Sequence, residues 1–132
     1  LIIGIYIMSS IVKTKLSNDI KNNLLTIQSV FIQGMKHQDS NGNTYNSVTI
    51  QVQTIDKDGN SSIDILARMF AKYGYGNEYY RRAETLLQNE FNFKCELFNT
   101  YYTDSHVKKS MFHKIKDYQE PIDEGYYTLT DY

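Results

Sequence analysis

The segment from residue 46 to residue 55 constrains the fold of this chain more than any other part of the sequence. Its valines and isoleucines alternate with threonines and glutamines, which is the period of a strand with one buried face. Asn41-Gly42 precedes the segment and Asp58-Gly59 follows it, and both pairs tolerate the positive φ angles that tight turns require. We therefore expect a strand between two turns, paired with a neighbour through the first of them.

The segments around this strand carry further signals. Residues Ile20 to Met35 have apolar side chains at helical spacing, but residues 26–33 are rich in strand-forming types. This pattern favours a helical start near residues 19–24 that runs into a strand. From Phe93 to Tyr101 apolar and polar residues alternate again, which predicts another strand with apolar residues on both faces.

Three segments show the spacing of amphipathic helices. The first begins at Ser61 or Ser62 and ends at Gly74, and the second begins after Asn77. The third begins at Asp104 or Ser105 and ends at Pro121. Their apolar faces consist, in order, of Ile63, Leu66, Phe70 and Tyr73; of Tyr79, Ala83, Leu86 and Leu87; and of Val107, Met111, Ile115 and Tyr118.

A chain of 132 residues fits a single compact domain, because domains most often contain roughly 100 to 150 residues. The patterns above predict an α+β domain with a small antiparallel sheet of about three to five strands, packed with about three helices. We place this domain at residues 1–119. Residues 120–132 contain four acids and no lysine or arginine, so they form an acidic, tyrosine-rich tail.

The chain begins with an apolar run from Leu1 to Ile7. This run is far shorter than the about 20 residues that a membrane-spanning helix needs, so no membrane partner is expected. Two interpretations stay open: the run is a non-native extension upstream of Met8, or it is a first strand. A single cysteine, Cys95, cannot form an internal disulfide, which fits a reducing compartment such as the cytoplasm.

The sequence contains no motif typical of catalysis or of metal binding, so we expect neither an enzyme nor a cofactor. The segment from Asp56 to Asn60 alternates oxygen-bearing side chains, but it lacks the glycine and glutamate of a calcium loop and fits a turn better. His106 and His113 are seven residues apart, which is too far for a zinc site on one helix. Cys95 lies in an alternating apolar pattern and is expected to be buried.

The segment from Phe70 to Arg82 interleaves aromatic residues with lysine and arginine. Aromatic rings stack on unpaired bases and cations meet phosphates, so this composition is typical of surfaces that bind single-stranded nucleic acid. Residues 105–116 form the densest basic stretch and contain no acid. The predicted nucleic-acid-binding residues are Tyr75, Tyr80, Arg81, Arg82, Lys108, Lys109, Lys114 and Lys116.

Other interpretations of the aromatic segment stay open. Asn77, Tyr80 and Arg81 at the start of a helix fit a helix-turn-helix that reads duplex DNA. Alternatively, the aromatic residues belong to the core and the arginines only surround it. Tyrosine and arginine also anchor protein interfaces, so the same surface fits a stoichiometric inhibitor or adaptor that binds a host protein.

The composition points to a source for the chain. Asparagine, lysine, isoleucine and tyrosine are abundant while alanine and proline are rare, which is what an AT-rich genome imposes. With the small size, this predicts a phage or mobile-element protein of the kind that inhibits a host defence factor. We therefore expect a non-catalytic binding protein whose partner is nucleic acid, single-stranded by preference, or a host protein.

Overall fold

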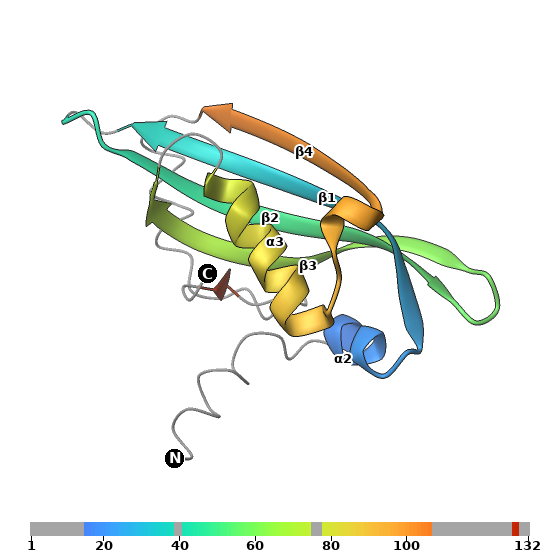
Figure 1. Ribbon diagram of the computed structural model, residues 1–132. Helices are drawn as coiled ribbons and strands as arrows, with labels where there is room; N and C mark the ends of the chain where they lie inside the picture. Colours follow the sequence, from blue (N-terminus) through green and yellow to red (C-terminus); the bar gives the residue numbers. More distant parts are fainter. Residues whose placement is uncertain (1–14, 39–40, 75–77, 107–127, 130–132) are drawn as a thin grey trace, which may run out of the picture.

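The computed structural model describes residues 15–38, 41–74, 78–106 and 128–129. The helices are α2 (Lys15–Lys21) and α3 (Glu78–Phe91), with a single 3₁₀ turn, η1 (Cys95–Leu97). The strands are β1 (Leu25–Gln38), β2 (Thr44–Asp56), β3 (Ser61–Tyr73), β4 (Asn99–His106) and β5 (Thr128–Leu129). Strands β1 to β4 form a curved sheet, and α3 lies across one of its faces (Figure 1). This arrangement is the predicted α+β domain.

The order of strands across the sheet is β4-β1-β2-β3-β5. Strands β1, β2 and β3 pair antiparallel, whereas β4 pairs parallel with β1 and β5 pairs parallel with β3. The prediction of an antiparallel sheet therefore holds for β1 to β3 and is wrong for β4. The reason is the connection through α3, because a parallel neighbour needs a long crossover and the chain crosses the sheet before it returns beside β1.

The segment from Ser61 to Tyr73 is strand β3, so the helix predicted for it is wrong. The pairing of β3 with β2 shifts register in two places, and at one of them Leu66 is an extra residue opposite Ile50 and Gln51. Such a bulge breaks the strict alternation of a strand, and Leu66 and Ala67 are both buried as a result. The apolar spacing therefore resembled that of a helix.

Both predicted turns are confirmed. Gly42 and Gly59 adopt φ angles of 84° and 86°, which side chains other than glycine rarely tolerate. In the second turn Asp56 Oδ1 accepts hydrogen bonds from the backbone N–H groups of Asp58 and Asn60, each at 2.9 Å. The bond from Asn60, supported by that from Asp58, lowers the pKa of Asp56. The acidic side chain therefore closes its own turn, as expected from the sequence.

The predicted order of a helix that runs into a strand is also confirmed, but α2 (Lys15–Lys21) lies earlier than the predicted residues 19–24, and β1 follows it. Asn23 has a positive φ of 62° and ends the helix. The backbone N–H of Asn23 donates to the carbonyl of Ile20 at 3.1 Å, and that of Leu24 donates to the carbonyl of Asp19 at 2.8 Å. These two bonds form a Schellman motif, in which asparagine takes the left-handed position usually held by glycine.

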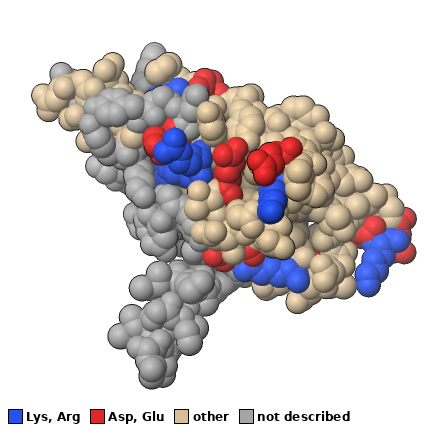
Figure 2. Space-filling view, in the orientation of Figure 1, with Lys and Arg blue, Asp and Glu red and all other residues tan. Residues whose placement is uncertain are grey.

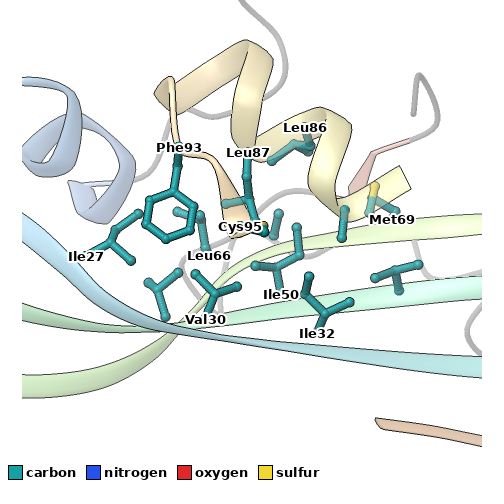
Figure 3. Packing of buried hydrophobic residues seen from close by; sticks show 14 of the residues in the cluster. Ile27, Val30, Ile32, Ile50, Leu66, Met69, Leu86, Leu87, Phe93 and Cys95 are labelled. Carbon is teal, nitrogen blue, oxygen red and sulfur yellow. The ribbon is translucent and has the colours of Figure 1, made fainter. Parts of the chain in front are cut away.

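The hydrophobic core lies between α3 and the sheet. The apolar stripe predicted for α3 is confirmed, since Tyr79, Ala83, Leu86 and Leu87 are at most 4% exposed. Figure 3 shows Leu86 and Leu87 of the helix meeting side chains of the sheet, with Phe93 and Cys95 joining them from the segment after α3. The predicted alternation of β2 is confirmed too, because its two valines and Ile50 are at most 1% exposed.

The segment after α3 differs from the prediction. Instead of a continuous strand from Phe93 to Tyr101, the chain forms η1 and then β4, which continues to His106. Asp104 and Ser105, predicted to begin a third helix, pair with β1 as part of β4. Pairing with a long neighbouring strand outweighs the local helix signal there. In the described ranges the domain therefore has two α-helices.

Several predictions lie outside the described residues. These are the third helix beyond residue 106, the apolar run at residues 1–7 and most of the acidic tail. Within the tail, Thr128 and Leu129 pair with Arg68 and Met69 as the edge strand β5. Of the helices that the structure describes, none has the length and apolar character needed to cross a membrane.

Candidate functional site

Two of the predicted site residues lie at the start of α3, near the surface. Tyr80 is half-buried, and its ring packs edge-on against Tyr79 at 5.3 Å and against Tyr102 at 5.0 Å. The side chain of Arg81 is 74% exposed, and its Nη1 lies 3.1 Å from Oε1 of Glu78. Tyr80 is thus part of an aromatic cluster, and Arg81 is a surface cation with a surface partner.

Arg82, expected to face outward, is instead buried, with 6% of its surface exposed. Its Nη1 donates to both the backbone oxygen and Oδ1 of Asn46 on β2, at 3.0 and 2.9 Å. Burial lowers the pKa of Arg82 to about 10, so the guanidinium stays charged at neutral pH. A residue held in this way ties α3 to the sheet, and its expected exposure was wrong because the helix turns it inward.

The remaining predicted site residues fall outside the described ranges. Tyr75 precedes α3, and Lys108, Lys109, Lys114 and Lys116 follow β4. Their predicted contribution to a nucleic-acid surface therefore stays a prediction.

The charges around α3 are mixed in sign. Figure 2 shows acidic and basic side chains next to one another on this face, with no large area of one sign. Ion pairs between described residues include Lys15 with Asp19, Lys21 with Glu90, Lys36 with Asp104, and Arg81 with Glu78. Binding to phosphates depends on an excess of positive charge, and the described residues of this face offer little of it.

A group of exposed apolar side chains lies within and just before β4, and its residues were not among the site residues predicted from the sequence. We call it the β4 edge cluster: Leu97, Phe98, Tyr101 and Tyr102 are 68%, 50%, 52% and 41% exposed. Large apolar side chains are normal on protein surfaces when scattered, but a contiguous group is typical of a binding site. Here Leu97 and Phe98 directly precede β4, and Tyr101 and Tyr102 belong to it, at one border of the sheet.

The two tyrosines of the cluster lie on opposite faces of the sheet. Tyr101 stacks on Phe31 of β1, with ring centroids 5.4 Å apart, on the face away from α3. Tyr102 points toward α3 and donates a hydrogen bond from its hydroxyl to the carboxylate of Glu84. Burial raises the pKa of Tyr102, and the bond to Glu84 raises it further. Both rings are held in place while part of each stays accessible.

The outer side of β4 is an open strand edge in the part of the chain that the structure describes. β4 stands at the end of the strand order, and all of its residues except Thr100 are exposed. Natural edge strands are usually protected by lysine, proline or bulges. β4 contains no lysine or proline, its acidic residue Asp104 is paired with Lys36 of β1, and its pairing with β1 is regular along its whole length. This edge is therefore suited to pairing with a further strand.

One sequence signal pointed to part of this cluster, although it did not show that the strand lies at an edge. Tyr101 and Tyr102 are adjacent, and adjacent residues in a strand point to opposite faces. Two rings on opposite faces are both buried only in a strand covered on both sides. The edge position of β4 depends on the crossover through α3, and this connection was hidden because β3 was taken for a helix.

A small hollow of about 230 Å³ adjoins the cluster, between α3 and η1. Its lining comprises Glu84, Gln88, Phe93, Lys94, Cys95 and Glu96. Cys95 is 8% exposed, and burial raises the pKa of its thiol from 9.0 to about 11. The thiol is therefore protonated at neutral pH, and it packs as an apolar side chain, as expected from the sequence.

The thiol of Cys95 is expected to react slowly with Ellman's reagent in the folded protein. Because only the thiolate reacts, a pKa of about 11 in place of 9.0 predicts a rate about 100-fold lower at pH 8 than in urea. The folded-state rate should rise about tenfold per pH unit until pH approaches this pKa. Equal rates in buffer and in urea would contradict this prediction.

Within the described ranges, no three side chains of histidine, cysteine, aspartate or glutamate are grouped so that they would hold a metal ion. Comparison with protein-family models, with curated proteins and with solved structures found no significant match to this chain.

Proposed function

We propose that this protein is a non-catalytic binding module that attaches to another protein through the β4 edge cluster. The observation that carries the proposal is the exposure of four large apolar side chains within and just before the edge strand β4. Interfaces between proteins are enriched in tyrosine, phenylalanine and arginine, and a few such residues supply most of the binding energy. A stoichiometric inhibitor or an adaptor requires such a surface and no reacting groups.

The placement of the arginines favours a protein partner over nucleic acid. Arg82 contacts Asn46 in the interior, and Arg81 is paired with Glu78 at the surface. The large aromatic side chains that are exposed in the described ranges are Phe98, just before β4, and Tyr101 and Tyr102 within it. Glu84 accepts a hydrogen bond from Tyr102, and Asp104 of β4 is paired with Lys36. Acidic side chains repel the phosphates of nucleic acid, whereas they can face basic groups on the surface of a partner protein.

A photo-crosslinking side chain placed at Phe98 or Tyr101 tests this proposal in the cells that make the protein. We expect one dominant crosslinked protein from each position, and about a tenfold or greater loss of affinity for it in Phe98→Ala or Tyr101→Ala. Ile63 is the matched control, because it is 56% exposed but lies on β3. The same adducts from position 63, or none from positions 98 and 101, would refute the proposal.

Single-stranded nucleic acid is the second candidate partner, and one observation favours it. The Tyr101 ring is 52% exposed and is supported from below by Phe31, which makes it a ready stacking surface for an unpaired base. Binding to a labelled oligonucleotide should then weaken steeply with salt and be reduced by Arg81→Ala or Tyr101→Ala. Negligible binding at low salt removes this candidate.

A further inference from the structure

We infer that the β4 edge accepts an extended segment of a partner protein as an additional strand of the sheet, and that this segment is basic. The inference rests on the proposed function and names the kind of partner. The steps that support it concern the backbone of β4, the side chains on its two faces and the charges around it.

The backbone of β4 has the groups that strand addition requires. It is an eight-residue strand paired parallel with β1 from Asn99 to His106. In a strand paired on one side only, about half of the backbone N–H and C=O groups point to the other side. No other described strand pairs with that side of β4. An incoming segment would therefore find a regular row of donors and acceptors.

The side chains of β4 would hold such a segment from both faces. Tyr101 lies on the face away from α3, where it stacks on Phe31. Tyr102 lies on the α3 face, where it packs against Tyr80. A neighbouring strand places successive side chains on alternate faces, so each ring would meet an apolar side chain of the segment. A partner helix or flat surface would contact only one of the two rings.

The charges near this edge select against an acidic segment. Asp104 is part of β4, Glu84 lies beside Tyr102, and Glu96 is exposed in η1. Lys36 pairs with Asp104 at 2.9 Å, and Lys94 lies near η1. Among these described residues the balance of charge is thus slightly acidic. We therefore assign as occupant an extended segment with alternating apolar residues, at least one lysine or arginine, and no central proline, which would remove a needed N–H group.

Selection from a displayed peptide library tests this inference. The library would hold random peptides about eight residues long, selected against the full chain. We expect the enriched peptides to alternate in polarity and to carry lysine or arginine. The best peptide, made synthetically, should lose at least about tenfold in affinity when alternate amides along one edge are N-methylated, and little when the other edge is methylated. Equal binding of all three forms, or no enriched peptide, would overturn the inference.

Two lysine substitutions test whether the peptide binds at the outer edge of β4 or is affected only by charge on the surrounding surface. Thr103→Lys adds a cation to the outer strand, where lysine is a natural protection against pairing, and should weaken peptide binding at least about tenfold. Gln33→Lys is the control, because Gln33 is exposed and is the partner of Thr103 on the inner neighbour β1. It should change the affinity by less than about threefold. Equal losses in both variants would mean that charge alone matters, and would overturn strand addition.

The remaining outcomes distinguish the inference from the proposed function. If methylated peptides bind normally while Phe98→Ala and Tyr101→Ala still weaken partner binding, strand addition fails and the protein-binding function stands. If the photo-crosslinks fail, both fail. Sedimentation equilibrium would show a dimer that Thr103→Lys abolishes if the occupant were a second copy of this chain, and that result would overturn a foreign partner.

Discussion

Replacing Gly34 with alanine is expected to lower the free energy of unfolding by about 3 kcal/mol. A Cβ atom at this position would lie 2.5 Å from two ring carbons of Tyr79. The ring has little room to move, because Tyr79 is 4% exposed and packs edge-on against Tyr80. The strand has little room either, since Gly34 is paired with Val48 on one side and Asp104 on the other.

Urea denaturation followed by circular dichroism measures this effect. Gln33→Ala is the control, because Gln33 is the exposed neighbour on the same strand, and it should change stability by less than about 0.5 kcal/mol. If the clash is with the ring, then Gly34→Ala should cost clearly less in a Tyr79→Leu background than in the wild type. An unchanged cost in that background, or no cost in the wild type, would contradict this explanation.

Replacing Arg82 with methionine is expected to cost about 2 to 3 kcal/mol of stability. Methionine keeps most of the volume of the buried stem, but it leaves the backbone oxygen and Oδ1 of Asn46 without the charged donor that now reaches both. Hydrogen bonds to charged groups contribute about 1.5 to 3 kcal/mol, and a buried acceptor left unpaired adds a desolvation penalty. The lost hydrogen bonds would weaken the contact between α3 and β2.

The neighbouring arginine provides a matched control. Arg81→Met removes an ion pair with Glu78 in which the arginine side chain is 74% exposed, and such surface pairs contribute roughly 0 to 1 kcal/mol. The unfolding midpoints of the two variants in urea should therefore separate clearly. If Arg82→Met proved as mild as Arg81→Met, the hydrogen bonds to Asn46 would not hold the helix to the sheet. The contrast also explains why a nucleic-acid test should vary Arg81 and leave Arg82 in place.

The elements predicted correctly are those whose signal is local. Gly42 and Gly59 mark turns because few other residues adopt their backbone angles. The alternation of β2 and the stripe of α3 each follow from the repeat of one regular element. The helix predicted for residues 61–73 failed because a bulge at Leu66 shifts the alternation of β3, and a bulge is a property of the pairing between two strands.

The residues of the candidate site divide in the same way, into features indicated by the local sequence and features that depend on contacts between distant segments. The composition of residues 70–82 pointed to tyrosine and arginine as surface groups, and Tyr80 and Arg81 do lie near the surface. It did not show that Arg82 contacts Asn46, a residue 36 positions earlier in the chain. It also did not show that Tyr101 and Tyr102 stand at a border of the sheet, since that depends on which strands β4 joins.

Periodicity and turn chemistry within about ten residues were enough to establish an α+β chain with a buried helix stripe and two tight turns, because these features depend on backbone preference and on the repeat of one element. Packing between distant segments determined the structural features on which the proposed binding depends. The crossover through α3 placed β4 beside β1, left one of its sides open among the described strands and turned Arg82 inward. Exposure is a relation between segments, so no single stretch of residues encodes it.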